Sequence, residues 1–189
     1  MKPKLCFIDV ETTGISQARN GIVQIGGLVC TEEGGITAVL DEFCLNVAPF
    51  PGDVIDDESL AVSGVTREEL KTFPPPAAVH ADITRLFEKY CNKFDRKDKM
   101  VFLGYNAPFD YGFLRKWFEK CGDKYFGSWF WHPAVDVMSL AMLRLADARN
   151  EMPDFKMVTV AAHLGIPIEQ AHNALADARA TKAIFEKVL

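Results

Sequence analysis

The sequence lacks the features that define several classes of protein. Its 189 residues include five cysteines, an odd number without a CxxC pair, which argues against both a disulfide framework and a zinc site. No apolar run approaches the roughly 20 residues that a membrane-spanning helix needs. Residues 1–3 lead directly into an apolar stretch, without the pattern of a secretory signal. We therefore expect a cytoplasmic protein that does not contact the membrane.

The chain also lacks an excess of positive charge. Its 21 lysines and arginines are outnumbered by 26 aspartates and glutamates, which gives a formal net charge of −5. A protein that holds long nucleic acid through a broad electrostatic surface needs the opposite balance. The basic residues between 93 and 99 are interrupted by Asp95 and Asp98, as is typical of a solvated turn. The charge disfavours a non-specific duplex binder, but it allows an enzyme that grips one strand end beside a metal ion.

What is present is the composition of a globular protein. Hydrophobic residues make up 49% and charged residues 25%, and the length suits a single domain, which we place at residues 1–189. Apolar runs predict strands at residues 5–8, 22–30, 36–47 and 100–105, a hairpin turn at 32–35, and a short strand that ends at Val135. Helices are predicted near 57–62 and 66–71, from the prolines at 74–76, after Pro108, and at 138–145, 158–164 and 174–188, with loops at 48–57 and 149–155. This order predicts a mixed sheet with helices packed on it.

Two acidic residues end the first predicted strand. Asp9 and Glu11 are two positions apart, so both side chains leave the same face of the strand. Taken alone, this pair could simply mark the place where a strand becomes a polar turn. Thr12, Thr13 and Gly14 follow, and hydroxyls, exposed N–H groups and a glycine are suited to contact with a nucleotide.

A third acidic residue, Asp110, falls in the first turn of the helix that follows the strand at 100–105. An acid at this position could simply complement the helix dipole. Asn106 could likewise cap the helix or turn the chain, and Phe109 is of a type found more often in a core than beneath a base. These residues are weak indicators one by one.

The last cluster consists of His172 and Asp177. Their spacing does not place them on one helical face, so we expect His172 on the loop that enters the last helix and Asp177 inside that helix. A histidine in such a place can take a proton from water at neutral pH. His80, His132 and His163 have no acidic motif beside them, and we give them no catalytic role.

All three clusters adjoin apolar runs that should bring them into one core. Gathered carboxylates repel one another unless cations lie between them. A pair of hard divalent metal ions is the cation that best suits this arrangement.

The three motifs together resemble the DEDDh family of 3′–5′ exonucleases. The resemblance rests on residues 9–14, 106–110 and 172–178, covers nearly the whole chain, and selects the histidine branch through His172. It implies an α/β, ribonuclease-H-like fold, with a five-stranded mixed sheet and helices on both faces. Ser63 and Gln24 depart from the family pattern, which puts substrate preference in doubt.

The resemblance also implies a reaction. Asp9, Glu11, Asp110 and Asp177 are expected to hold two Mg²⁺ ions, for which Mn²⁺ should substitute, and His172 is expected to be the general base. Thr12, Thr13, Gly14, Asn106 and Phe109 are expected to contact the substrate.

The expected product is a nucleoside 5′-monophosphate released from a single-stranded DNA or RNA 3′ end. A homodimer and association with a polymerase are both open. A phosphodiesterase for short oligonucleotides and a non-catalytic nucleic-acid-binding module stay as alternatives.

Overall fold

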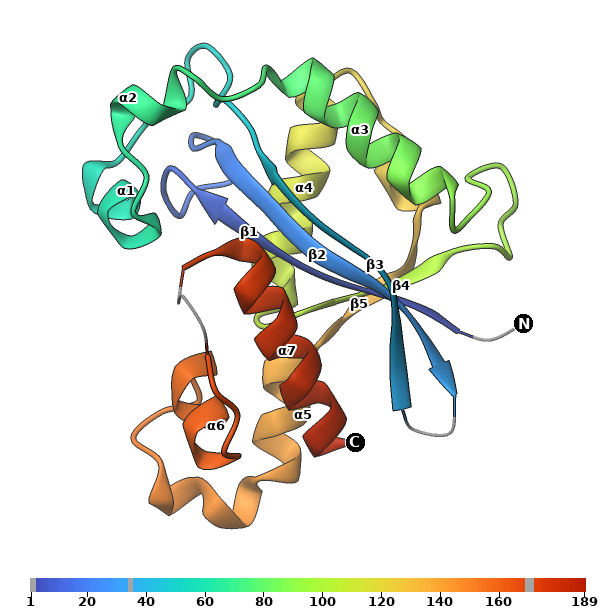
Figure 1. Ribbon diagram of the computed structural model, residues 1–189, viewed down its shortest axis with the longest axis vertical. Coiled ribbons are helices and arrows are strands. Elements are labelled where there is room, and N and C mark those ends of the chain that lie inside the picture. The colour runs from blue at the N-terminus through green and yellow to red at the C-terminus, as the bar shows by residue number, and fades with distance from the viewer. Residues whose placement is uncertain (1–2, 34–35, 169–171) are drawn as a thin grey trace.

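The computed structural model describes residues 3–33, 36–168 and 172–189, and its five strands form one mixed sheet. The strands are β1 (Lys4–Thr12), β2 (Ile22–Glu33), β3 (Ile36–Asn46), β4 (Met100–Gly104) and β5 (Phe130–Asp136). They lie in the order β3-β2-β1-β4-β5, with antiparallel pairing from β1 to β3 and parallel pairing from β1 through β4 to β5 (Figure 1). The predicted mixed five-stranded sheet is confirmed, while part of the predicted turn at 32–35 lies outside the described residues.

Seven α-helices and two 3₁₀ turns complete the part of the chain that the structure describes. The helices are α1 (Asp57–Ser63), α2 (Arg67–Leu70), α3 (Pro76–Glu88), α4 (Ala107–Lys120), α5 (Val137–Arg144), α6 (Met157–His163) and α7 (Ala174–Val188). The 3₁₀ turns are Phe126–Ser128 and Ala146–Glu151. The loop predicted at 149–155 is therefore wrong in its first part, because a tight turn there brings Met152 back into the core.

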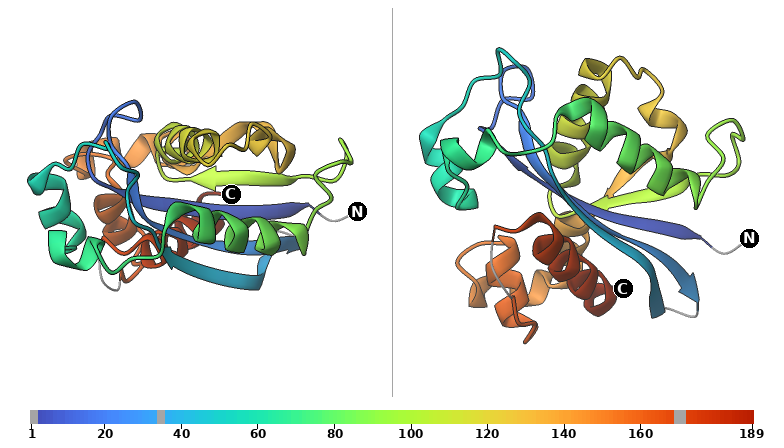
Figure 2. Two further views of the ribbon diagram at one scale, coloured as in Figure 1. Left: turned by 90° about the horizontal axis from the view of Figure 1, so that it is seen from above. Right: turned by 45° about the horizontal axis from the view of Figure 1, so that its top comes forward.

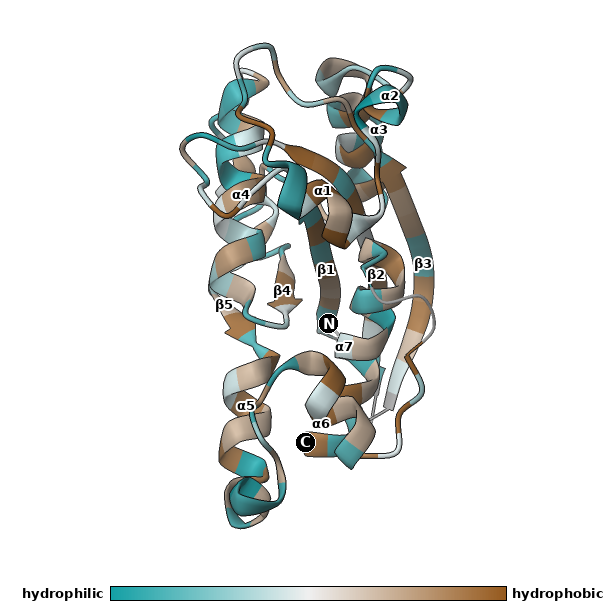
Figure 3. Cartoon of the chain, turned by 90° about the vertical axis from the view of Figure 1, so that its left-hand side faces the viewer, coloured by the Kyte–Doolittle hydropathy of each residue, from teal (hydrophilic) through white to brown (hydrophobic). Residues whose placement is uncertain are grey.

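Helices cover both faces of the sheet, as predicted. Cys6, Ile8 and Val10 of β1 pack into the layer formed with α3 and α4, whereas Leu5 and Phe7 pack into the layer formed with α5, α6 and α7. Figures 1 and 2 show the sheet between these two layers, and Figure 3 shows much of the hydrophobic colouring along the strands. Among the described residues, no helix is long and apolar enough to cross a bilayer.

The unequal lengths of the central strands prepare one end of the sheet for a site. The parallel pairing of β1 with β4 runs only from Leu5 to Phe7 of β1, so the strand extends beyond its neighbour on that side. Both α4, which follows β4, and α7 begin at this end of β1. On the side of β4, the backbone at the end of β1 is thus left without a neighbouring strand, and the first turn of α4 lies there.

Candidate active site

The carboxyl end of β1 presents two acidic side chains to α7. Successive residues of a strand point to opposite faces, and Val10 points into the layer of α3 and α4. Asp9 and Glu11 therefore share the other face, which α7 covers. In the antiparallel register Gly26 stands opposite Asp9 and Gln24 stands opposite Glu11.

The first turn of α7 lies directly on β2. A Cβ atom at Gly26 would lie 2.2 Å from the main-chain carbon of Ala174 and from the nitrogen of Leu175, so only glycine allows this approach. Gln24 fixes the same contact, since its Oε1 accepts the Ala174 N–H at 2.9 Å and its Nε2 donates to Asn46 Oδ1 at 2.8 Å. The position of α7, and hence of its acidic residue, is set from β2.

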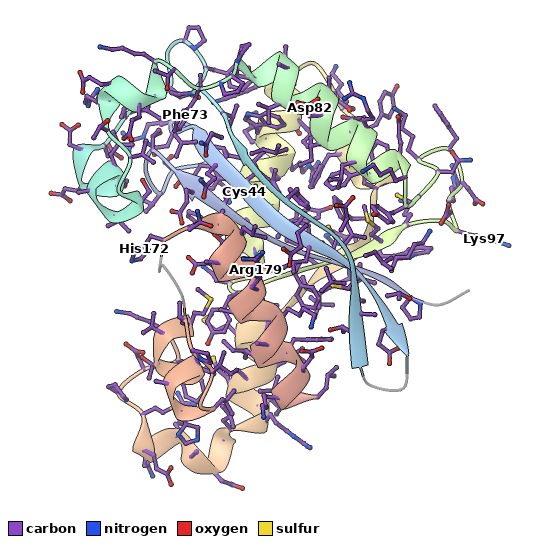
Figure 4. All side chains as sticks on the ribbon, viewed as in Figure 1. Cys44, Phe73, Asp82, Lys97, His172 and Arg179 are labelled. Atoms are coloured by element: carbon purple, nitrogen blue, oxygen red, sulfur yellow. The ribbon has the colours of Figure 1, made fainter. Side chains whose placement is uncertain are left out.

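This docking brings His172 and Asp177 to Glu11. One ligand atom from each of the three residues lies within 4.8 Å of the other two. His172 precedes α7 with a left-handed backbone φ of 69° and an exposed side chain (Figure 4). Asp177, in the first turn of α7, is buried. The structure therefore has the arrangement expected from the spacing, with the histidine on the entering loop and the aspartate inside the helix.

Asp110 reaches the same end of β1 from the opposite layer. Its Oδ1 accepts the backbone N–H of Val10 at 3.1 Å, at a position where β1 has extended beyond β4. The side chain is only 3% exposed. A surface acid that merely complements a helix dipole would not be buried in this way, so Asp110 belongs to the cluster.

Asp136 holds the start of α4, a task that its sequence position did not reveal. Its Oδ1 accepts N–H groups of Asn106 at 2.9 Å, Ala107 at 3.3 Å and Met138 at 3.3 Å. Its Oδ2 accepts the Ser139 hydroxyl at 2.5 Å. The position of Asp136 before the predicted helix at 138–145 indicates an N-cap, but its link to α4 exists only in the fold.

Burial raises the pKa of all four carboxyl groups, and neighbouring negative charge adds to this effect at Asp9, Glu11 and Asp110. Desolvation raises the pKa of Asp9 well above its ordinary value, and the neighbouring carboxylates add to that shift. Desolvation and the charge of Asp177 raise the pKa of Glu11 to about 7. Burial also raises the pKa of Asp110, against its backbone hydrogen bonds, and that of Asp177, against the backbone N–H and charge of His172.

The donor groups fit a divalent cation. Asp177 Oδ1 is buried and has no hydrogen-bond partner among the described residues, which is a costly state for a carboxylate oxygen. The same carboxylate belongs to the group with Glu11 and His172. Clustered carboxylate oxygens are the ligands that hard divalent ions prefer, so this end of β1 could hold such an ion.

The residues after Glu11 serve the fold more than sequence analysis expected. Thr13 is buried, and its hydroxyl donates to Val54 O at 2.6 Å while accepting the Gly21 N–H at 2.9 Å. A Cβ at Gly14 would lie 2.2 Å from an oxygen of Asp56, so the glycine is explained by internal packing. Thr12 donates to Gly14 O at 2.7 Å and is half-buried. Contacts from these residues to a substrate stay a prediction.

The other two predicted substrate contacts lie at the start of α4. Asn106 has a left-handed backbone with a φ of 66°, its side chain is exposed, and it makes no capping hydrogen bond. Phe109 is half-buried against Phe113, with ring centroids 4.8 Å apart. Phe109 directly precedes Asp110 in the chain and Asn106 lies four residues before it. Contact of either residue with a nucleotide stays a prediction.

Ser63, which departs from the family pattern, and the three other histidines lie outside the carboxylate cluster. The Ser63 hydroxyl donates to Leu60 O at 3.2 Å at the end of α1. His80 lies 3.2 Å from Asp123 Oδ2, between α3 and the end of α4. His132 lies in β5 and His163 ends α6.

A five-stranded mixed β-sheet in which only β2 runs antiparallel to the other strands, flanked by helices and carrying clustered carboxylates and a histidine at the end of β1, defines the ribonuclease-H-like class of nucleases. Residues 6–185 match the exonuclease family RNase_T. The chain therefore belongs to this exonuclease family, of the DEDD type, as its three motifs indicated.

Curated relatives agree with this family. DNA polymerase III PolC-type of Streptococcus suis is 30% identical over 176 residues, and that of Oceanobacillus iheyensis is 26% identical over 181 residues. The matched segments cover 92% and 96% of this chain but only 10% and 11% of the polymerases. The chain thus spans about a tenth of the length of these relatives.

Solved structures agree with the fold. E. coli exonuclease I in complex with a dT13 oligonucleotide has a TM-score of 0.79 at 22% identity, covering 99% of this chain and 41% of that one. A zinc-ion-bound form of the same protein with single-stranded DNA has a TM-score of 0.78 at 23% identity, covering 98% and 40%. These neighbours establish the arrangement of strands and helices.

Proposed function

We propose that this chain is a divalent-metal-dependent 3′–5′ exonuclease that removes nucleoside 5′-monophosphates from single-stranded ends. The observation that carries the proposal is the meeting of Glu11, His172 and Asp177, with ligand atoms within 4.8 Å of one another, beside two further carboxylates. Membership of the exonuclease family supports the same chemistry, which is hydrolysis of a phosphodiester bond. We place this activity in a single domain over residues 1–189.

Asp9, Glu11, Asp110 and Asp177 would hold two metal ions. When bound, such ions lower the pKa of a water, neutralise charge on the phosphate and stabilise the leaving 3′-oxygen. The unpartnered Asp177 Oδ1 and the raised pKa values of the four carboxyl groups support this assignment. We propose Mg²⁺ as the ion, with Mn²⁺ able to substitute, because the carboxylate oxygens match both.

His172 would take the proton from the attacking water at an imidazole nitrogen. Its exposed position before α7 leaves the ring open to solvent, while its backbone N–H is directed to Asp177. The general base and an expected metal ligand are thereby linked through the same turn of chain. A proton acceptor placed in this way typically contributes ~10²–10⁴-fold to a hydrolysis rate.

We propose DNA as the preferred polymer and a replicative polymerase as a partner. The curated relatives are DNA polymerases, and exonuclease I was solved with DNA oligonucleotides. Both facts concern those proteins, so the polymer has to be tested on this chain.

The test uses 5′-labelled single-stranded DNA and RNA, with Mg²⁺, with Mn²⁺ and with chelator. We expect a metal-dependent ladder that shortens from the 3′ end, no ladder with Asp177→Ala, and a rate reduced ~10²–10⁴-fold with His172→Ala. Exposed His163→Ala is the matched control and should retain the wild-type rate. Wild-type turnover in the His172 variant would remove the general-base assignment, and no ladder on either polymer would contradict an exonuclease of long strands.

A preference for very short substrates is the second candidate, and the net charge of −5 favours it. An acidic protein gains less from each added phosphate of a long strand. Comparison of a dinucleotide with a strand of about twelve nucleotides separates the two candidates, since a short-substrate enzyme would turn over the dinucleotide faster.

A further inference from the structure

A groove of about 570 Å³ follows the outward stripe of α4. On the helix its wall consists of Pro108, Gly112, Arg115, Lys116 and Glu119, which recur at the three- and four-residue spacing of one helical face. Residues 132–134 of β5 and residues 17–18 of the loop after β1 form the rest of the lining. None of these residues has a part in the carboxylate cluster.

The groove begins beside the candidate active site. Pro108 lies two residues before Asp110, in the first turn of α4. Gln17, on the loop that follows β1, has its Nε2 at 3.5 Å from Pro108 O and 3.4 Å from Phe109 O. The loop also packs closely on the helix, because a Cβ at Gly112 would lie 2.2 Å from Gln17 Nε2. A chain that leaves the carboxylates past the start of α4 therefore meets this groove next.

The rim of the groove carries more positive than negative charge. Arg115 and Lys116 both pair with the single carboxylate of Glu119, at 3.6 and 3.2 Å. The side chains of Arg115 and Lys116 are 66% and 48% exposed, and such exposed pairs contribute little to stability. A phosphate can therefore replace Glu119 as their partner at small cost.

The floor of the groove offers rings rather than charges. Tyr111 is half-buried, and its ring centroid lies 6.3 Å from that of the exposed His132 at an interplanar angle of 66°. Pro133 and Ala134 continue this floor. Flat rings beneath a cationic rim are the combination that holds single-stranded nucleic acid without regard to sequence.

We propose that this groove binds the single strand that trails from the active site. Arg115 and Lys116 would contact its phosphates, and Tyr111 and His132 would contact a base. The inference rests on the proposed function, since it takes the 3′ end to lie at the carboxylates. From Pro108 to Glu119 the helix rises about 17 Å, which is enough for more than one nucleotide beyond the scissile bond. The groove then matters for long substrates and not for a dinucleotide.

The experiment compares the variant Arg115→Ala/Lys116→Ala with the control Arg85→Ala/Lys97→Ala. The control removes the same charge at exposed positions of α3 and of the loop after it, and Figure 4 shows Lys97 far from His172. For a single strand of about twelve nucleotides we expect KM to rise at least fivefold in the groove variant, with kcat within twofold. For a dinucleotide, kcat/KM should change less than twofold. Equal effects of the two double variants, or equal effects on both substrates, would overturn the proposal.

Equilibrium binding separates this proposal from the proposed function. Fluorescence anisotropy of the labelled strand in chelator requires no hydrolysis. We expect the groove variant to bind at least fivefold more weakly than the control. Its slope of log Kd against log salt should be smaller by about 1.4, because each lost phosphate contact on a single strand removes about 0.7. If the wild type binds in this way but hydrolyses nothing, the proposed function is contradicted, while the groove remains supported as a binding site for a single strand. If the groove variant binds like the wild type, or the wild type does not bind, the groove assignment fails.

Discussion

At the scale of single residues, the crowded carboxyl groups of the site oppose folding when they ionise. Glu11 is the clearest case, because desolvation and the charge of Asp177 raise its pKa from 4.5 to about 7. Between these two pH values the folded protein binds more protons than the unfolded chain. The free energy of unfolding therefore falls as the pH rises through this range, when no metal is present.

We expect Glu11→Gln to remove this pH dependence in part. In chelator, the wild type should lose on the order of 2 kcal/mol of stability through Glu11 between about pH 5 and about pH 7. The variant should show a shallower loss, because its amide does not ionise. Urea unfolding at several pH values measures both. Glu68→Gln, at an exposed position of α2, is the control and should follow the wild type; parallel curves for the Glu11 variant would contradict the expectation.

The acidic residues and His172 could be chosen from the sequence because their types and spacing follow a motif. Gly26 and Asp136 could not be chosen in the same way. Glycine is required at position 26 because main-chain atoms of α7, about 150 residues later in the chain, lie against it. The task of Asp136 is to accept hydrogen bonds from backbone N–H groups at the start of α4. Such tasks depend on which elements become neighbours, and a single sequence does not state that.

At the scale of elements, the contact of α7 with β2 decides whether the site assembles. The helix brings Asp177 and, through the preceding loop, His172. The strand provides Gly26 for close approach and Gln24 for a hydrogen bond to Ala174. A small displacement of α7 would separate its residues from Glu11.

We expect Gly26→Ala to lower both stability and activity. The added methyl group would overlap the main chain of α7, which typically costs about 1–3 kcal/mol. The rate of hydrolysis should fall more than tenfold, because a shifted α7 carries Asp177 away from Glu11. Gly127→Ala is the control, since nothing lies within 4 Å of a Cβ there. Thermal unfolding and the nuclease assay give the two readouts; a Gly26 variant as active as its control would contradict the role assigned to this contact.

The order of strands and helices was predictable from sequence, because apolar runs and turn residues recur along the chain. The bounds of β5, the last strand in the chain, are harder to predict. Only its end at Val135 was anticipated, whereas β5 runs over Phe130–Asp136 with three exposed residues, 131–133, that break the apolar pattern. The 3₁₀ turn Ala146–Glu151 is likewise not apparent from sequence, because the packing of Met152 stabilises it.

At the scale of the whole molecule, the site joins two helical layers across one sheet. Asp110 arrives from the layer of α3 and α4, and Asp177 arrives from the layer of α5, α6 and α7. A metal ion held by both would link these layers. Binding to the folded chain alone would then stabilise the whole fold.

We expect Mn²⁺ to raise the midpoint of thermal unfolding by several degrees. Stabilisation of about 1–2 kcal/mol corresponds to roughly 2–8 °C for a protein of this size. Chelator should reverse the shift, and Asp9→Asn should abolish it. Differential scanning calorimetry measures the effect. The same shift in the Asp9 variant would show that the ion stabilises the protein from another place.

The position of α7 in the chain also has a consequence for synthesis. Every other part of the site belongs to segments that a ribosome makes earlier, from β1 to α4. Domains begin to fold from the N-terminal side while the rest of the chain is still being made. The sheet can thus form beside its own messenger RNA without His172 and Asp177. The proposed exonuclease would thus gain its general base and its fourth carboxylate only after α7 has emerged and docked on β2.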